Sequence, residues 1–424
     1  MKSNIVRLIQ SFHKISLPVL VTLLSFDRFC QKYCFRIWTI LLIVPLITGC
    51  LKSDNPAQNQ SFVKFYGNSA FSEGSDVKQT PDGGYVIVGT AETINRGTDI
   101  ILIKTDSYGN QEWSPKFFGG NLNDSACSVQ VTNDGGFIIA GSKEISTNGI
   151  VTSKIFIVRT NAQGDSIWTK VVGGNKNDIA YFVQLNGQGG YLVTGYSESF
   201  GTGGKDAILV NLDLNGNIIW LRTYGTNSDY YAKCVQTTKD GFVLIGSTNT
   251  SPSSTNIFVA RTNSLGFLLQ TAIIGGNDNI SGEYIQPLPD GGFVGIGTKK
   301  SANNSYSSLR LFKLDDLIDT VIWSKDYGNN NEKDEGRTVQ ITSDNGFVFA
   351  GTKGISDANS NFYFIKTDSM GKIIFSKNYG LTGLLRGENI IQTNDGGFVL
   401  VGTNTVGGYS TITLIKVMSN GELN

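Results

Sequence analysis

The sequence contains almost no histidine, and this absence limits the chemistry that the protein can perform. His13 is the single histidine among 424 residues, and it lies in an N-terminal region that we expect to be removed. A histidine-based catalytic triad, a histidine general base and a histidine metal ligand are therefore excluded for the rest of the chain. The sequence accordingly predicts no catalytic residue, no metal site and no cofactor.

Net charge is also absent, because 35 lysine and arginine residues balance 35 aspartate and glutamate residues. This balance argues against nucleic acid, or an anionic membrane surface, as a partner attracted by charge. Proline is scarce at 8 residues, glycine is abundant at 51, and no long stretch of helical periodicity follows residue 50. The composition favours strands joined by tight turns.

The first fifty residues differ in kind from the rest. Basic residues dominate them, and the apolar run 40–47 follows, which is the layout of a signal peptide. The run ends in Ile47-Thr48-Gly49-Cys50, which resembles the lipobox of bacterial lipoproteins, where the cysteine is lipidated and becomes the first mature residue. An uncleaved membrane anchor is the alternative, but the run is too short to favour it. A second apolar run, 15–26, indicates a later translation start or an atypical leader.

The lipobox resemblance divides the chain into three regions. Residues 1–49 are expected to be the signal peptide, residues 50–61 the lipidated Cys50 with a flexible polar tether, and residues 62–424 the folded part. The resemblance implies a lipid-anchored protein of the bacterial cell envelope, at the outer membrane, facing either the periplasm or the cell surface.

One motif, typified by Asp134-Gly135-Gly136-Phe137-Ile138-Ile139-Ala140-Gly141, returns seven times after the leader. By subtraction, successive copies lie 51 to 54 residues apart, a period typical of propellers and solenoids. In every copy a glycine follows the aromatic residue by four positions. These aromatic residues are Tyr85, Phe137, Tyr191, Phe242, Phe293, Phe347 and Phe398.

Each copy reads as four antiparallel strands. In the clearest copy they are 126–132, 137–140, 154–159 and 166–172, with tight turns after the first and the third. We interpret the second turn, an Asp or Asn followed by Gly, as an Asx side chain capping its own backbone, rather than as a calcium loop or a sialidase Asp-box. A tryptophan follows this turn in four copies, and we expect it to pack where neighbouring sheets stack. The four are Trp113, Trp168, Trp220 and Trp323.

The stretch from Leu212 to Trp220 resembles the Asp, Gly and Trp signature of quinoprotein-type (PQQ-like) propeller repeats. The resemblance implies an all-β fold, a seven-bladed β-propeller of four-stranded antiparallel blades. Only the repeat signature is visible, without a quinone site, so a quinoprotein dehydrogenase is not favoured. In a ring of this kind we expect Cys127 and Cys234 to be small buried side chains rather than a disulfide.

The two ends of the chain predict how the ring closes. The last copy stops after its third strand, 411–417, and lacks the strand that carries the tryptophan. Residues 62–67 align with that missing strand, with Phe62 in the tryptophan position. An N-terminal strand that completes the C-terminal blade would remove two exposed sheet edges. An open solenoid, the alternative, would have no use for such complementary ends.

The two faces of the disc differ in how variable they are. Both tight turns of each blade lie on one face, which we call the turn face. The loops between second and third strands and the connections between blades lie on the other, which we call the connection face. Because the loops of the connection face vary in length and residue type, we expect ligands there. The candidate binding residues are Phe71, Asp124, Asp178, Asp229, Tyr230, Tyr231, Tyr284, Asp334 and Arg386.

These candidates support two readings of the acidic residues and two of the function. The aspartates form either an acidic rim for a cation or polar ligand, or local caps on backbone in each blade. We favour a noncatalytic, monomeric binding or scaffold propeller for a protein or glycan partner, with aromatic side chains as anchors. The alternative is a carbohydrate-active enzyme that uses carboxylates alone, drawn from Glu283, Glu332, Asp334, Glu335 and Glu388.

The lipoprotein interpretation makes a direct prediction. The mature protein should begin at Cys50 and sediment with membranes, because several acyl chains bind a bilayer far more strongly than the marginal affinity of a single chain. Cys50→Ser should release the protein or block its processing, which membrane fractionation and intact-mass measurement would detect. A Cys50→Ser protein of unchanged mature size that stays in the membrane fraction would exclude the lipid anchor.

Overall fold

The structure is a computed structural model that describes residues 60–67, 70–251, 254–276, 279–301, 305–329, 331–356 and 359–423. The expected leader, Cys50 and the tether up to residue 59 lie outside these described residues. In the part of the chain that is described, no helix has the length and apolar character needed to cross a membrane.

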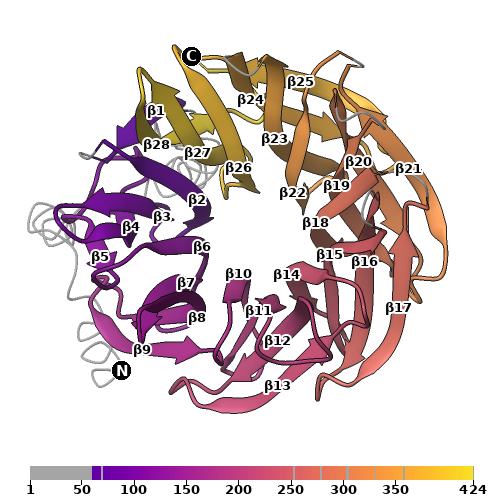
Figure 1. Cartoon of the computed structure of the whole chain (residues 1–424). Coiled ribbons are helices and arrows are strands. Elements are labelled where there is room, and N and C mark those ends of the chain that lie inside the picture. The colour runs from indigo at the N-terminus through magenta and orange to yellow at the C-terminus, as the bar shows by residue number, and fades with distance from the viewer. Residues whose placement is uncertain are drawn as a thin grey trace, which may run out of the picture. The chain divides into compact units, whose positions relative to one another are not determined.

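The described chain is all-β and forms 28 strands, arranged in meanders of four (Figure 1). The first strands surround the centre of the ring: β2 (Ser72–Gln79), β6 (Asp124–Val131), β10 (Asp178–Leu185), β14 (Tyr230–Thr237), β18 (Asn279–Pro287), β22 (Glu335–Ile341) and β26 (Leu384–Gln392). The second strands are β3 (Tyr85–Thr93), β7 (Phe137–Thr147), β11 (Tyr191–Ser197), β15 (Gly241–Ser251), β19 (Phe293–Lys300), β23 (Phe347–Ser356) and β27 (Phe398–Val406).

The third and fourth strands lie progressively farther from the centre. The third strands are β4 (Gly97–Thr105), β8 (Ile150–Thr160), β12 (Asp206–Leu212), β16 (Ser254–Asn263), β20 (Ser307–Leu314), β24 (Asn359–Thr367) and β28 (Tyr409–Val417). The fourth strands are β5 (Lys116–Phe118), β9 (Ser166–Val172), β13 (Ile218–Tyr224), β17 (Leu268–Ile274), β21 (Val321–Tyr327) and β25 (Ile373–Tyr379), with β1 (Phe62–Tyr66) beside β28.

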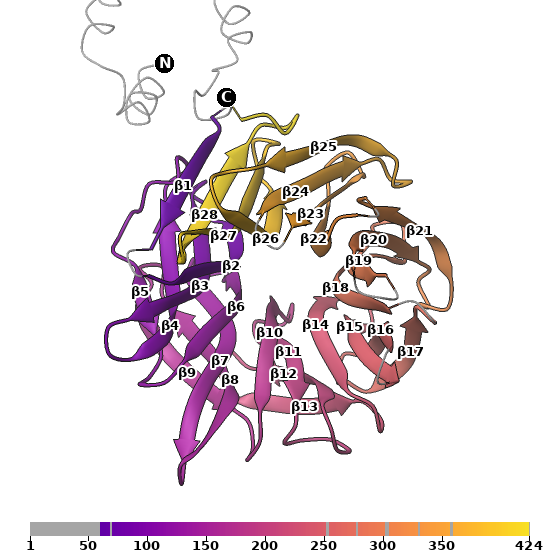
Figure 2. The same cartoon turned by 45° about the horizontal axis from the view of Figure 1, so that its top comes forward.

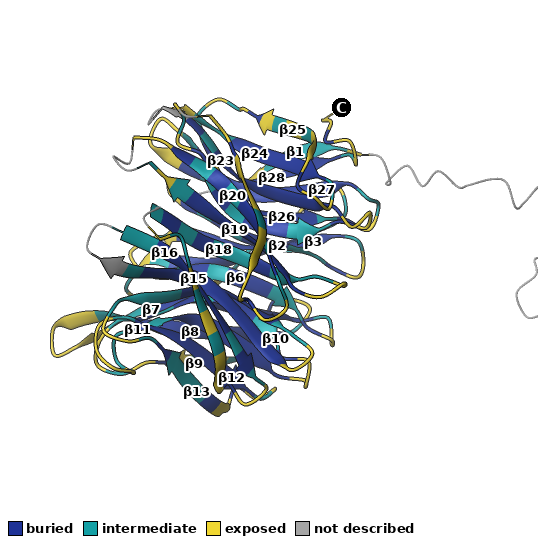
Figure 3. Ribbon diagram, turned by 90° about the vertical axis from the view of Figure 1, so that its right-hand side faces the viewer, coloured by how far each residue is buried: buried dark blue, intermediate teal, exposed yellow. Residues whose placement is uncertain are grey.

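Five of the sheets have four strands each, and one has eight. The eight-stranded sheet is two meanders, β22 to β25 and β26 to β28 with β1, which are joined by one parallel bridge between Ser360 and Leu384. The sheets follow one another around the ring, with their buried residues inside and their exposed residues at the loops and outer edges (Figure 3). The predicted four-stranded antiparallel repeat is therefore confirmed.

The second meander extends further than the sequence suggested. Residues 142–153 were expected to form a loop, but β7 and β8 continue to Thr147 and Ile150, which pair directly. The two residues between them, Asn148 and Gly149, both have positive φ, at 52° and 81°. A two-residue type I′ hairpin turn requires positive φ at both central residues, and its twist matches that of the flanking strands. The two strands therefore stay paired up to this turn.

The N-terminal strand pairs as predicted. β1 runs antiparallel to β28, from Phe62 opposite Lys416 to Tyr66 opposite Ile412 (Figures 1 and 2). β28 would otherwise present an open edge, and unpaired edges promote association with other chains.

Neighbouring sheets are held together by a repeated aromatic contact. Tryptophans of three outer strands pack on the hairpin aromatic of the next sheet: Trp168 lies 6.0 Å from Tyr191, Trp220 lies 6.0 Å from Phe242, and Trp323 lies 6.1 Å from Phe347, between ring centroids. Phe62 of β1 makes the same contact with Tyr85, at 6.3 Å. The prediction that the tryptophans pack between sheets is confirmed, and β1 extends the same contact to the first sheet.

Each contact also needs a glycine in the Asx turn of the next sheet. Gly266 has φ of 74°, and a Cβ atom on it would lie 2.7 Å from Trp220. The Asx side chains cap these turns as predicted, since Asp213 Oδ1 accepts hydrogen bonds from the backbone N–H groups of Asn215 and Asn217 at 2.9 and 2.8 Å. The corresponding turn of the fifth meander, 315–319, is irregular, since Ile318 has φ of 60° there.

One irregularity recurs in every first strand and determines what faces the centre. Directly after a small residue the register shifts by one, so that a single residue is skipped in the pairing. The small residue is required by close packing, because a Cβ atom on Gly74 would lie 2.7 Å from the carbonyl oxygen of Gly402 in the neighbouring sheet. The skipped residue forms a β-bulge, which redirects its side chain.

Deleting β1 should therefore destabilise the protein far more than deleting the tether 51–61. The loss of the contacts of Phe62, Val63 and Tyr66 should remove about 4–6 kcal/mol and lower the melting temperature by roughly 5–10 °C. Differential scanning calorimetry of the two deletions would measure this difference. Equal melting temperatures would contradict the role of β1.

Candidate functional site

The seven skipped residues surround one pocket at the centre of the ring. They occupy equivalent positions, and yet they include six residue types with very different chemistry. They are Ser75, Cys127, Tyr181, Lys233, Glu283, Arg337 and Glu388, and all seven line a cavity of about 170 Å³, which we call the axial pocket. Each lies near the start of its strand, so the pocket belongs to the connection face.

Two aromatic residues form much of the floor of the axial pocket. Phe182 and Tyr284 come from first strands that are not neighbours, β10 and β18, and their rings meet edge to face with centroids 5.6 Å apart. Burial raises the pKa of the Tyr284 hydroxyl well above its ordinary value. Tyr284, a candidate binding residue of the connection face, lies within strand β18 rather than in a loop, and it lines the pocket.

Charged residues occupy one arc of the pocket and neutral residues the other. Lys233, Glu283, Arg337 and Glu388 follow one another on four successive meanders, so positive and negative charges alternate there. Arg337 forms ion pairs with Glu335 at 2.7 Å and Glu388 at 3.6 Å.

Asp76 completes the floor and is fully engaged. It accepts hydrogen bonds from Ser128 Oγ and the Val129 backbone N–H, both at 3.0 Å, and from the amide of Asn389. Lys78 forms an ion pair with it at 2.5 Å. Asp76 thus links the first sheet to both neighbouring sheets below the pocket.

The neutral arc contains Cys127, one of the two free cysteines among the described residues. Burial raises the pKa of Cys127 to about 11, so at neutral pH this side chain is a thiol and not a nucleophilic thiolate. The prediction that Cys127 and Cys234 form no disulfide is confirmed, but Cys127 lines the polar pocket instead of an apolar core.

The turn face has its own cavity at the axis, of about 780 Å³. Glutamines ring this end of the axis: Gln130 Nε2 donates to Gln184 Oε1 at 3.1 Å, and Gln286 Nε2 donates to Gln340 Oε1 at 2.9 Å. These side-chain amides form hydrogen bonds with one another between neighbouring sheets, so they connect the sheets at this end of the axis.

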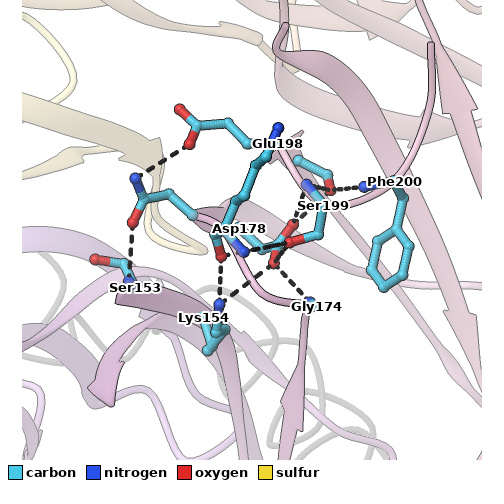
Figure 4. Close-up of polar contacts among 10 residues, drawn as sticks. Ser153, Lys154, Gly174, Asp178, Glu198, Ser199 and Phe200 are labelled. Atoms are coloured by element: carbon cyan, nitrogen blue, oxygen red, sulfur yellow. Dashed lines mark hydrogen bonds and ion pairs between the residues drawn. The ribbon is translucent and has the colours of Figure 1, made fainter. Parts of the chain in front are cut away.

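Three of the four predicted acidic positions cap backbone. Asp124 accepts hydrogen bonds from the N–H groups of Gly120 at 2.5 Å and Glu144 at 3.0 Å, and Asp229 accepts one from Lys205 N–H at 3.0 Å. Asp178 accepts from Gly174 N–H at 2.9 Å and Ser199 Oγ at 2.7 Å, with Lys154 at 3.8 Å (Figure 4). Local capping, rather than an acidic rim, therefore describes these three aspartates.

Asp334 differs from the other three. It is fully buried, and neither of its carboxylate oxygens has a hydrogen-bond partner among the described residues. Burial, opposed by Lys353, raises the pKa of this carboxyl from 3.8 to about 6. No cluster of His, Cys, Asp or Glu within the described ranges is placed to hold a metal ion.

The predicted aromatic anchors are less exposed than expected. Tyr230 and Tyr231 both belong to β14 and are half-buried: Tyr230 packs on Phe258 at 5.0 Å, and Tyr231 packs on Tyr196 at 5.3 Å. Phe71 is 36% exposed on the connection face. Arg386 is exposed and pairs with Glu388 at 2.9 Å.

Of the five carboxylates considered for catalysis, only two meet in the axial pocket. Glu283 and Glu388 line it. Glu335 lies beside Arg337, Glu332 pairs with Lys353 at 2.7 Å, and Asp334 is buried elsewhere.

The sequence interpretation did not identify the axial pocket. A signal was available, because the position after the small residue varies in chemistry, whereas the Gly or Ala before it and the Val or Ile two positions after it repeat in every copy. The bulge that turns this position toward the axis, however, follows from strand register and not from residue type.

Sheets of four antiparallel strands that surround a polar axial pocket define the class of the protein as a β-propeller. Among solved structures, YCF48 bound to D1 peptide is similar, with a TM-score of 0.51 and 9% identity over 85% of this chain and 96% of that one. The periplasmic gluconolactonase PpgL of Pseudomonas aeruginosa is similar with a TM-score of 0.50 and 11% identity, over 84% and 99% of the two chains. At these identities the likeness shows the fold.

Sequence similarity covers less of the chain than structural similarity does. No family model matches the chain. The regulatory protein FlaEY of Caulobacter vibrioides is 30% identical over 162 residues, which are 34% of this chain. The match spans 17% of the length of that relative.

The pKa of Asp334 predicts a pH-dependent stability. Because its folded pKa is raised, the ionised form is disfavoured in the folded state: the cost is absent below about pH 4 and complete above pH 6. Asp334→Asn should therefore stabilise the protein by about 2 kcal/mol at pH 7.5 and leave it nearly unchanged at pH 4. Denaturant unfolding at both pH values would measure this.

Asp178→Asn provides the matched control. Its carboxylate accepts several hydrogen bonds, so this variant should lose about 1–3 kcal/mol at pH 7.5. A destabilised Asp334→Asn protein at pH 7.5 would show that the Asp334 carboxylate is stabilising after all.

Proposed function

We propose that this protein is a noncatalytic binding propeller, anchored to a membrane through a lipid on Cys50, that docks a protein partner on its connection face. In this proposal each meander is one of seven blades, and β1 completes the last blade and closes the ring. The anchor would hold the propeller in the bacterial cell envelope.

The axial pocket is the observation that carries the proposal. Seven equivalent bulge positions line it, and one backbone arrangement accommodates six residue types at them. Six different residue types at seven equivalent sites are a feature of a recognition surface, since specificity requires differences that packing does not impose. The repeated turns of the turn face offer no comparable variety.

The surroundings of the pocket favour a protein partner. On the same face, the connections between second and third strands of three meanders carry exposed apolar residues: Ile94, Ile150 and Tyr409 are 89%, 67% and 65% exposed. Large exposed apolar side chains around a polar centre suit protein docking. The solved structure of YCF48, which has the same fold, contains a bound peptide, and this agrees with the proposal.

One observation supports the alternative, a carbohydrate-active enzyme that uses carboxylates alone: Glu283 and Glu388 share the axial pocket. Two features weigh against it. Arg337 and Arg386 already engage the Glu388 carboxylate. The pocket, at about 170 Å³, is also below the roughly 300 Å³ at which ligand sites for larger molecules begin. Two sugar rings and the bond between them would not fit.

Site-specific photo-crosslinking tests the docking face. A photoreactive phenylalanine derivative would replace Ile94, Ile150 or Tyr409 on the connection face, one at a time, in the native host. Leu214, Leu265 and Met370 are the matched controls, since they are apolar, 60%, 56% and 63% exposed, and lie in the opposite turns.

We expect the connection-face positions to yield one discrete adduct, identified by mass spectrometry, at least 5-fold more abundant than any adduct from the turn-face positions. An adduct confined to the turn-face positions would place the partner on the other face and overturn the proposal.

A further inference from the structure

Two residues that line the axial pocket each have a buried polar atom without a partner. Thr338 and Asn389 both line it and are 2% and 7% exposed. Thr338 Oγ1 and Asn389 Oδ1 have no hydrogen-bond partner among the described residues. Leaving such atoms without a hydrogen bond costs about 1–3 kcal/mol each. We therefore expect a bound molecule to supply the missing hydrogen bonds.

The orientation of Asn389 is determined by its neighbour. The Asn389 amide nitrogen donates to Asp76 Oδ1, and an ionised carboxylate only accepts hydrogen bonds. The NH₂ group must therefore face Asp76, which leaves the carbonyl oxygen as the free atom. A molecule that satisfies Asn389 has to donate an N–H or O–H.

Lys233, in contrast, requires a hydrogen-bond acceptor, because an ammonium group only donates. Its ammonium nitrogen lies 3.5 Å from the centre of the Tyr181 ring, and it makes no hydrogen bond or ion pair with any described residue. Burial lowers the pKa of this lysine. Burial removes hydration from the ammonium group. An anionic hydrogen-bond acceptor in the pocket would replace that hydration and stabilise the positive charge.

The charges around the pocket cancel. Lys78, Lys233 and Arg337 balance Asp76, Glu283 and Glu388, so neither a simple anion nor a simple cation is favoured overall. The volume of about 170 Å³ is close to that of an engineered cavity of about 150 Å³ that accepts benzene. The ligand is thus small and has an anionic end and a donor end.

We propose that the axial pocket binds an amino-acid moiety, with its carboxylate at Lys233 and an N–H donor at Asn389 Oδ1 and Thr338 Oγ1. The inference rests on the proposed binding function and names the chemistry that the connection face recognises. No bond is made or broken.

The moiety has two sources, a free amino acid or the C-terminal residue of a polypeptide, since both present a carboxylate and an N–H. A second hollow on the connection face, of about 500 Å³, shares Arg337 with the axial pocket and is also lined by Glu73, Lys333 and Arg386. It has room for the residues that would precede a C-terminus.

Isothermal titration calorimetry with the purified full-length protein distinguishes these cases. Each of the twenty standard L-amino acids would be titrated singly, followed by the N-acetyl and the carboxamide derivatives of the tightest binder, and by glycine betaine. We expect a Kd below 1 mM for at least one free or N-acetylated amino acid. Binding of the N-acetyl form indicates a polypeptide C-terminus, and binding of the free form alone indicates a free amino acid. The carboxamide, without an anion, and betaine, without an N–H, should bind at least 10-fold more weakly.

Two pairs of variants locate the site. Lys233→Met should weaken binding at least 10-fold, while Lys239→Met, an exposed lysine in the following turn, should not change it. Thr338→Val should weaken binding about 3-fold or more. Thr413→Val also removes a buried hydroxyl without a partner, but one outside the pocket, so it should leave affinity unchanged. Neither threonine variant should lower the melting temperature by more than 2 °C.

Three results would overturn the inference: no binding by any probe at 10 mM, equal affinity of the acid and its carboxamide, or full affinity in Lys233→Met. The crosslinking experiment would still stand by itself, because its adduct depends on the loop tips and not on the pocket. Failure of the crosslinking with intact calorimetric binding would leave a small-molecule site and remove the protein partner.

Discussion

The contact between each outer-strand aromatic and the next sheet is the interaction on which this structure depends. Trp168, for example, packs on Tyr191 of the following sheet and against Gly216 of its Asx turn. A tyrosine of the outer strand adds a hydrogen bond, as where Tyr224 donates to the Gly266 carbonyl oxygen at 2.7 Å. Four-stranded sheets cannot bury both faces alone, so these contacts between sheets supply the core. β1 repeats the pattern, since Tyr66 donates to the Gly109 carbonyl oxygen at 2.7 Å.

This arrangement separates stability from recognition. The aromatic contacts between sheets lie toward the rim and the turn face, whereas the bulge residues line the axial pocket and contact mainly one another. Changing Lys233 or Glu283 therefore leaves the aromatic contacts in place, while changing Trp220 or Gly266 would disturb two sheets at once. A ring held at its periphery can vary the chemistry of its centre at small cost to stability.

The distribution of charge in the axial pocket is asymmetric. Its neutral arc, with Cys127 and Tyr181, faces a charged arc in which cations and anions alternate. Asp76, held by Lys78 and by groups from both neighbouring sheets, anchors the floor beneath it. Such a pocket orients a ligand that carries its own separated charges. It also gives little long-range attraction, in agreement with the zero net charge of the chain.

The sequence alone determined the repeat, the four strands of each copy, the Asx turns and the pairing of β1 with β28. These features depend on local periodicity and on residues such as Gly216 and Trp168, whose roles recur in each copy. The tertiary structure alone decided which side chains meet at the axis, because a β-bulge of one residue turns Lys233 and Arg337 inward and no residue type announces it. It likewise decided that Tyr284 lies on the pocket floor and that Tyr230 is half-buried, since a strand's period of two assigns faces only once its register is known. The proposed lipid anchor lies outside the described residues, so it rests on the sequence around Cys50 alone.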